Sequence, residues 1–159
     1  MTKHLLKPIH IKVELSADID TVWYAWTTEK GVQSFFAPDS KIDLQVGGEY
    51  EIFFNPEKTT GIRGAEGTRI LAIEPKKFLS FSWNNPPALP EIRWQYSNVC
   101  LYFKALDSKK TQLELVHAGW GTGENWEKAR VYFERAWKDV VIPRLISMMT
   151  SGPINLPQV

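Results

Sequence analysis

The chain has 159 residues, a length that suits one domain with a single core. Its 19 basic and 18 acidic residues leave a net charge of +1 and no basic stripe, which argues against a nucleic-acid partner. The single cysteine, Cys100, excludes an internal disulfide and fits a reducing compartment. Residues 1–8 lack the apolar segment of a signal peptide, and no apolar run approaches the roughly 20 residues that cross a bilayer. We therefore expect a cytoplasmic protein without a membrane span.

Aromatic residues are unusually frequent, with seven Trp, five Tyr and eight Phe. Each of these side chains can bury roughly 150–250 Å² of surface. The set is large enough either to fill a core or to line a cavity inside one.

The N-terminal third predicts one strand and two short helices. Apolar and polar residues alternate over 9–15, which is the pattern of a strand with one buried face. Asp18 or Asp20 can cap the first helix. Gly31 is expected to break it, and Pro38 to end the second helical turn.

A series of hairpin-sized strands follows. Short turns between them favour an antiparallel meander over a parallel sheet. The predicted strands cover 41–46, 50–54, 68–73, 78–83, a long strand through 99–103, and 112–115.

From Glu124 the apolar residues recur with a period of 3.6, which predicts a long amphipathic helix. About 25 residues at 1.5 Å each make a rod of roughly 38 Å, long enough to cross a sheet. Pro143 is expected to kink the helix and to shift its phase, so that Arg144 turns away from the apolar stripe. The domain core is expected to span 9–150, with a loose tail over 151–159. The predicted apolar face consists of Trp126, Ala129, Phe133, Ala136, Trp137, Val140 and Val141.

The residue types that carry most catalytic and metal chemistry are scattered. His4, His10 and His117 do not cluster, so no metal site is predicted. The G-x-G-x-G of 119–123 precedes a helix but lacks the βαβ unit of a dinucleotide site, and no cofactor is expected. Cys100 is best interpreted as a packed, inert thiol.

Two polar residues share a strand face with apolar ones. If the long strand extends back without a bulge, Arg93 lies on the same face as Val99 and points to the interior. A buried charge must be paired, and Glu66 or Glu91 could pair with it. Arg93 is then either part of a structural ion pair or a polar anchor for a ligand. His117 shares the strand face of Leu113 and Leu115, so it too is expected to point to the interior.

Four stretches resemble those of a known family. They are TVWYAWTTEKGVQSFFAP (21–38), GGEYEIFF (47–54), LSFSWNNPPALPEIRWQ (79–95) and HAGWGTGENWEKARVYFERAWKDVVIPRL (117–145). The family is that of the bacterial SRPBCC proteins, START-related helix-grip domains similar to the C-terminal domain of the activator of the heat-shock-protein ATPase.

The resemblance implies an α+β helix-grip fold over a single domain, residues 1–159. In this fold a seven-stranded curved antiparallel sheet, with two short helices after its first strand, wraps around a long C-terminal helix. The family has a hydrophobic cavity between sheet and helix that is used for lipids, sterols, polyketides or flavonoid-like molecules. It has no universal catalytic residue, and its members range from binding proteins to cyclases.

The leading hypothesis is therefore a binding protein for a small hydrophobic molecule, favoured over an enzyme and with no assigned catalytic residue. The alternatives are a cyclase or hydrolase that uses Arg93, Glu66 or His117 as acid–base groups, and an interaction module like the chaperone activator. A chaperone partner and a homodimer are left open. The candidate ligand-binding residues are Trp26, Phe36, Phe54, Trp83, Leu101, Phe103, Trp120, Phe133 and Trp137, with Arg93 and His117 as polar anchors.

Overall fold

The first alternating segment forms strand β1 (Ile9–Leu15), as predicted, in the computed structural model, which describes residues 5–156. Helices α1 (Ile19–Thr27) and α2 (Glu29–Gln33) follow. The carboxylate of Asp18 caps α1 by accepting a hydrogen bond from the backbone N–H of Thr21 at 3.2 Å.

The break between the two helices lies at Thr28, and not at Gly31 as predicted. The hydroxyl of Thr28 donates to the carbonyl of Tyr24 at 2.9 Å and accepts from the N–H of Gly31 at 2.9 Å, so it ends one helix and begins the next. Gly31 lies inside α2, where its missing side chain allows the two helices to approach closely.

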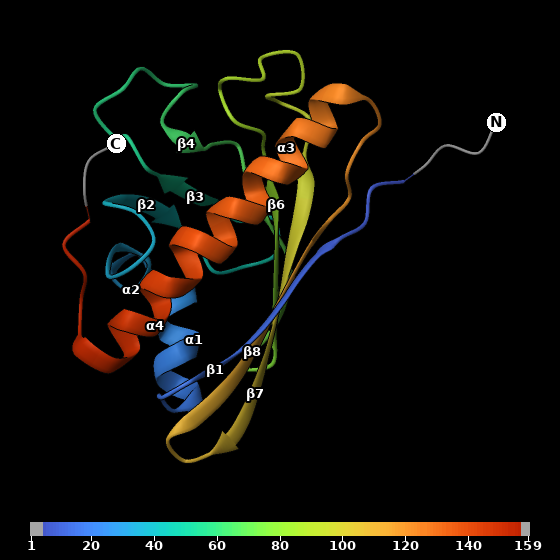
Figure 1. The fold of residues 1–159 in the computed structure, drawn as a ribbon. Helices are drawn as coiled ribbons and strands as arrows, with labels where there is room; N and C mark the ends of the chain where they lie inside the picture. Colours follow the sequence, from blue (N-terminus) through green and yellow to red (C-terminus); the bar gives the residue numbers. More distant parts are fainter. Residues whose placement is uncertain (1–4, 157–159) are drawn as a thin grey trace.

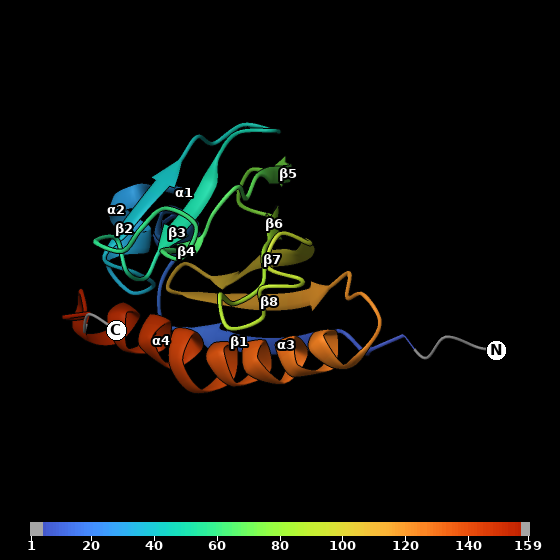
Figure 2. The same ribbon diagram turned by 90° about the horizontal axis from the view of Figure 1, so that it is seen from above.

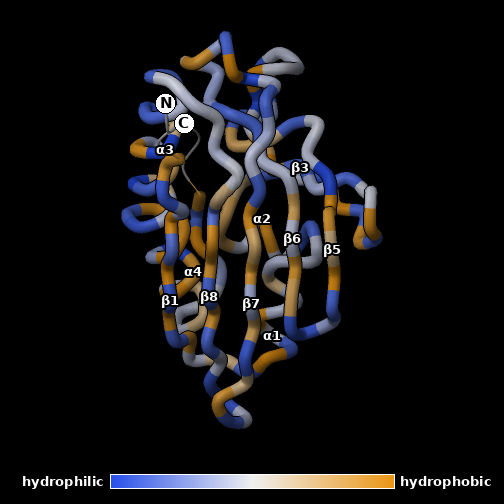
Figure 3. The backbone as a smooth tube through the Cα atoms, turned by 90° about the vertical axis from the view of Figure 1, so that its right-hand side faces the viewer, coloured by the Kyte–Doolittle hydropathy of each residue, from blue (hydrophilic) through white to orange (hydrophobic). Residues whose placement is uncertain are grey.

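The strands fall into two antiparallel sheets within the described residues (Figure 1). The five-stranded sheet has the order β1-β8-β7-β6-β5, with β5 (Ile70–Glu74), β6 (Phe78–Trp83), β7 (Ser97–Asp107) and β8 (Lys110–Ala118). The three-stranded sheet has the order β2-β3-β4, with β2 (Asp39–Ile42), β3 (Tyr50–Phe53) and β4 (Gly64–Ala65). Figure 3 shows the five strands side by side.

The two sheets are joined where β3 and β5 approach each other. The N–H of Tyr50 donates to the carbonyl of Thr68 at 3.0 Å, and the N–H of Ile70 donates to the carbonyl of Gly48 at 2.9 Å. The α+β helix-grip architecture is thus confirmed. The strands form two sheets instead of the one seven-stranded sheet expected, and β4 is an additional strand that the sequence did not predict. The strand predicted over 41–46 already ends at Ile42, and Leu44 and Val46 are exposed in the turn beyond it.

The C-terminal helix crosses the five-stranded sheet as one long rod (Figures 1 and 2). It comprises α3 (Glu124–Arg135), a π-helical turn (Ala136–Val141) and α4 (Ile142–Ser151), and we call these three segments the rod. The disruption expected at Pro143 takes the form of this wide turn. In it the N–H of Ile142 donates to the carbonyl of Trp137, five residues back. The turn leaves Val140 exposed, although the 3.6-residue period had placed it on the apolar face.

The core lies between the rod, the two short helices and the inner faces of both sheets. In the β7–β8 hairpin, Val99 is paired with His117 and Leu101 with Leu115, and all four side chains are buried. Cys100, between Val99 and Leu101, is half-buried on the opposite face, as its parity predicts. Among the described residues, no helix combines the length and apolar composition needed to cross a bilayer.

The segment after the rod is the predicted tail, of which 157–159 lie outside the described residues. Within the described part, the N–H of Ile154 donates to the carbonyl of Ser34 at 3.0 Å. This bond connects the tail to the end of α2.

We predict that Gly31→Ala lowers the free energy of unfolding by about 1–3 kcal/mol, because overpacked sites lose stability on that scale. An added Cβ would lie 2.2 Å from the carbonyl oxygen of Tyr24 and 2.7 Å from the Cα of Ala25, and both are backbone atoms that cannot rotate away. Urea denaturation monitored by Trp fluorescence measures the change. The exposed neighbour Lys30→Ala is the control and should stay within about 0.5 kcal/mol of the unmodified protein. Equal stability of the two variants would contradict the prediction.

Candidate functional site

A cavity of about 260 Å³ lies between the π turn of the rod and the loops at one end of the sheets. The three-stranded sheet and its β3–β4 connection contribute one wall, and the end of β6 with the loop after it contributes another. The rod lines the third side. The lining residues are Phe36, Phe54, Asn55, Ile62, Gly64, Ala65, Trp83, Asn84, Asn85, Pro86, Pro87, Arg93, Tyr132, Phe133, Ala136, Trp137, Val140, Val141 and Arg144.

Aromatic rings form the floor of the cavity. The ring of Phe36 packs against those of Phe54, Trp83 and Trp137 at centroid distances of 5.7, 6.0 and 5.6 Å. Ala136 faces the same space from the rod with only a methyl group. The rod therefore leaves volume unfilled where its wide turn passes over these rings.

The cavity opens to solvent along the rod. Ile62, Tyr132 and Val140 line it and are nevertheless 47%, 55% and 40% exposed, so they mark its rim. Arg144, one turn beyond Val140, is half-buried and also lines the cavity. The predicted phase shift was meant to turn Arg144 away from the apolar stripe, and this part of the prediction is wrong. The shift occurs before Pro143, so it moves Val140 outward and leaves Arg144 beside the cavity.

Asparagine side chains interrupt the apolar lining. Asn84 and Asn85 are 2% and 0% exposed. The amide nitrogen of Asn85 donates to the carbonyls of Ile92 and Gln95 at 2.9 and 2.8 Å, which orients that amide. Its Oδ1, the Nδ2 of Asn84 and the Oδ1 of Asn55 have no protein partner among the described residues. Unpaired buried polar atoms are rare, and these three give both of these walls a polar character.

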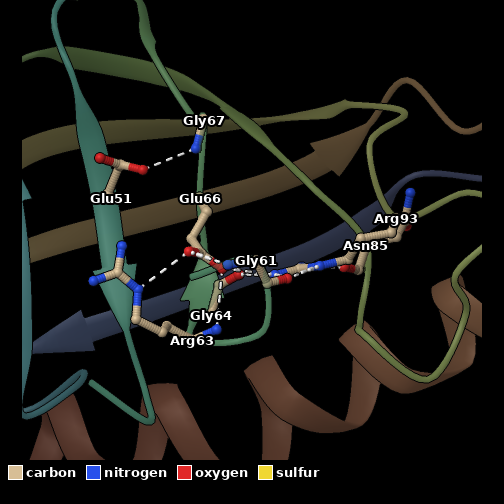
Figure 4. A network of polar contacts seen from close by, with 8 residues as sticks. All are labelled: Glu51, Gly61, Arg63, Gly64, Glu66, Gly67, Asn85 and Arg93. Carbon is tan, nitrogen blue, oxygen red and sulfur yellow. Dashed lines mark hydrogen bonds and ion pairs between the residues drawn. The ribbon is translucent and has the colours of Figure 1, made fainter. Parts of the chain in front are cut away.

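Arg93 joins the loops of the two walls, namely the β3–β4 connection and the loop after β6 (Figure 4). Its guanidinium, 5% exposed, donates to the carbonyls of Gly61, Gly64 and Asn85 and pairs with the carboxylate of Glu66 at 3.2 Å. Of the two partners that the sequence offered, Glu66 is the one that pairs. Arg93 does not lie on the long strand, because β7 begins only at Ser97 and the preceding residues form a turn. The strand-parity argument for Arg93 was therefore wrong, although the residue is buried.

Glu66 is bound from several directions. Its carboxylate accepts from the backbone N–H groups of Gly61 and Arg63 at 2.8 and 3.0 Å and from the Arg63 guanidinium at 3.2 Å. Burial raises the pKa of Glu66, but these hydrogen bonds and the charge of Arg63 outweigh it and hold the pKa below its usual value. Burial is also the main cause that lowers the pKa of Arg93. The pair is thus an ionised structural link.

His117 lies in the interior and joins the rod to the sheet. The indole N–H of Trp137 donates to its Nδ1 at 3.1 Å, so its Nε2 carries the proton and donates to the hydroxyl of Ser97 at 2.7 Å. Burial lowers the pKa of His117 from 6.5 to about 3. The ring is therefore neutral and does not line the cavity, so it is not the polar anchor that the sequence predicted.

The space beneath the N-terminal part of the rod is filled with side chains. The rings of Trp120 and Phe133 lie 4.3 and 5.0 Å from the ring of His117, and Trp126 packs on Trp120 at 6.4 Å. The cavity lies beyond these packed rings, around the π turn.

The structure brings six of the predicted site residues to the cavity and leaves five away from it. Phe36, Phe54, Trp83, Arg93, Phe133 and Trp137 line it. Trp26, Leu101, Phe103, His117 and Trp120 are buried in the core instead.

Sequence reasoning missed the asparagines and Arg144 as lining residues. The loop that contains the Asn-Asn-Pro-Pro run of 84–87 is held through Arg93, which binds Asn85 and the distant Gly61 and Gly64, and local spacing does not indicate such contacts. No cluster of three or more metal-ligating side chains occurs within residues 5–156.

Comparison with known proteins gives one family and many structural neighbours. The model described as Activator of Hsp90 ATPase homolog 1-like protein matches residues 16–147. A search of curated proteins finds no match.

Among solved structures, protein MLL2253 from Mesorhizobium loti superposes with a TM-score of 0.72 at 18% identity, covering 93% of this chain and all of that one. PFC0360w, an HSP90 activator from Plasmodium falciparum, gives 0.69 at 16% identity, with 94% and 99% of the two chains covered. DynU16, from the dynemicin biosynthetic locus, gives 0.66 at 17% identity over 93% of this chain and 49% of its own. At these identities the likeness concerns the fold.

We predict that Arg93→Ala lowers the free energy of unfolding by about 3–5 kcal/mol, because it leaves the carbonyls of Gly61, Gly64 and Asn85 without this donor and removes one of the two guanidinium groups that pair with the buried Glu66 carboxylate. Arg93→Lys should recover little of the loss, since a single ammonium cannot replace a guanidinium that reaches four acceptor groups. Urea denaturation of both variants measures the effect. Arg69→Ala removes an exposed arginine and should change the free energy by no more than about 0.5 kcal/mol. A loss for Arg93→Ala as small as that for Arg69→Ala would refute the structural role.

The buried neutral state of His117 predicts a loss of stability in acid. Its pKa is about 3 in the folded chain and near 6.5 in the unfolded chain, so below pH 6.5 only the unfolded chain takes up the proton. The stabilisation is complete above pH 6.5 and is lost as pH falls toward 3, with a slope of up to about 1.4 kcal/mol per pH unit.

Urea denaturation from pH 7 to pH 4 tests this, with His117→Gln and the exposed-site control His10→Gln. The first variant should show a shallower pH dependence than the unmodified protein, and the control should not. If His117→Gln keeps the full slope, another group causes it.

Proposed function

Given that this chain belongs to the family of Activator of Hsp90 ATPase homolog 1-like proteins, we propose that it binds a small, mainly apolar molecule in the cavity under the π turn. The observation that carries the proposal is a cavity with a floor of aromatic rings that opens to solvent. Binding sites for small molecules are typically concave and apolar, with a few polar groups that orient the ligand. The cavity combines these features.

The volume favours a compact guest. At about 260 Å³ the cavity is slightly smaller than the roughly 300–1,000 Å³ of sites for drug-sized ligands. Flat rings stack well on aromatic side chains. Of the molecules that the family resemblance suggests, ring compounds of the polyketide or flavonoid type suit this space better than a long lipid. The fold shared with DynU16, a protein of a biosynthetic locus, is consistent with a role beside small molecules.

Binding is favoured over catalysis because the acid–base groups named from the sequence are engaged in holding the fold. Glu66 accepts four hydrogen bonds from Gly61, Arg63 and Arg93. His117 has both ring nitrogens bonded inside the core. A general acid or base must reach the substrate proton, and these groups face protein partners instead.

A second candidate function is stimulation of a chaperone ATPase. The family description and the fold shared with the Plasmodium HSP90 activator favour it. It needs a protein-binding surface and not the cavity, so a cavity-filling variant should leave it intact.

We predict that Ala136→Phe blocks the cavity and weakens ligand binding at least tenfold. Ala136 lines the cavity with a methyl group and makes no side-chain hydrogen bond, so the larger side chain occupies the space without breaking one. Ser147→Phe places the same side chain on an exposed position of the rod and is the matched control.

Quenching of Trp fluorescence by a panel of flavonoid-like and aromatic polyketide-like compounds measures binding, after native mass spectrometry of freshly purified protein. At least one compound should bind more tightly than about 1 mM, or roughly 4 kcal/mol. A panel without such a compound, or equal binding by Ala136→Phe, would sink the proposal. ATPase rates of a chaperone with and without the protein test the second candidate.

A further inference from the structure

The cavity is lined by positive charge without a matching acid. Its lining includes two arginines, Arg93 and Arg144, and no aspartate or glutamate among the described residues. An apolar hollow next to unbalanced charge concentrates the electrostatic field, because its walls have a low dielectric constant. The balance of these charges therefore bears on the kind of molecule that enters.

The charge of Arg93 is only partly neutralised. Glu66, its partner at 3.2 Å, also pairs with Arg63 at 3.2 Å, so one carboxylate serves two guanidinium groups. These three side chains together carry a net positive charge behind the cavity wall, whereas the carboxylate of Glu51, also drawn in Figure 4, accepts from the N–H of Gly67.

Arg144 adds a cation that has no partner among the residues that the structure describes. It is half-buried at the rim, and neither an ion pair nor a side-chain hydrogen bond is found for it within residues 5–156. The other side chains that the rod presents to the cavity are apolar or aromatic, namely Tyr132, Phe133, Ala136, Trp137, Val140 and Val141. A charged residue on this stripe is out of keeping with packing alone. Its position suits a group that pairs with an incoming anion.

We propose that the ligand is an apolar carboxylic acid, with its ring system over the aromatic floor and its carboxylate at Arg144. This inference rests on the proposed function. An ionised carboxylate accepts hydrogen bonds only, and the planar guanidinium can donate two of them in parallel. The unpaired amide nitrogen of Asn84, on the same lining, is a further donor for such a group.

The test compares two probes of equal shape, 2-naphthoate and its neutral isostere 2-naphthamide, at neutral pH. We expect the naphthoate to bind at least tenfold more tightly, since a charge-assisted hydrogen bond is worth roughly that factor or more. Arg144→Met should remove the preference, because it weakens the binding of 2-naphthoate more than that of 2-naphthamide. Arg135→Met removes an exposed arginine of the same rod and should keep the preference. Raising the salt concentration should reduce the preference, because Arg144 is partly solvated.

The outcomes separate this inference from the proposed function. Equal binding of the two probes overturns the inference and leaves a neutral apolar ligand. A preference that survives in Arg144→Met overturns the assignment of the carboxylate to Arg144. Failure of both probes and of the wider panel to bind overturns the proposed function as well. Circular dichroism shows whether Arg144→Met is folded. If the variant is unfolded, the comparison of the two probes on the unmodified protein decides whether the cavity prefers a carboxylate.

Discussion

The hydrogen bond from Trp137 to His117 connects the rod to the middle of the five-stranded sheet, and the position of the cavity depends on it. His117 projects from β8, bonds Ser97 on β7, and thereby links two strands to one indole. Because the bond sets where the rod lies over the sheet, it also determines which part of the rod faces packed rings and which part faces open space. The imidazole is neutral and buried, so this connection is a feature of the folded state at neutral pH.

The loops at the end of the sheets depend on a second polar link. Arg93 binds the backbone of the β3–β4 connection and of the loop after β6, two segments about 30 residues apart in the chain. Neither segment has much regular structure of its own. Without a buried group that binds both backbones, their polar atoms would need solvent, and a wall of the cavity would be lost.

The cavity itself results from a mismatch between the rod and the surface beneath it. On the N-terminal side Trp120, Trp126 and Phe133 fill the gap, whereas at the π turn the helix widens and presents Ala136. Pro143 accounts for the location of that turn, because it lacks the N–H that a regular helix would direct at Asp139. The interruption of the helix near Pro143 thus lies beside the opening of the cavity, with Val140 turned outward and Arg144 at the rim.

The amino-acid sequence by itself determined the elements that depend on local periodicity. The alternation of β1 and of the β7–β8 hairpin and the amphipathic rod follow from the spacing of apolar residues, because backbone geometry alone sets which neighbours share a face. The cap at Asp18, one of two candidates in the sequence, follows from its carboxylate, which accepts a backbone N–H. It also indicated the family and the aromatic residues nearest the cavity, such as Phe36 and Trp83.

Only the tertiary structure decided which aromatic side chains pack and which leave a gap. Trp26 and Phe103 have the same pattern as the lining residues but do not line the cavity. The partner of Arg93, the tautomer of His117 and the burial of Asn85 likewise depend on segments that are distant in the chain. Periodicity carries no information about the distance between two such segments, and that distance determines both a cavity and a charge pair.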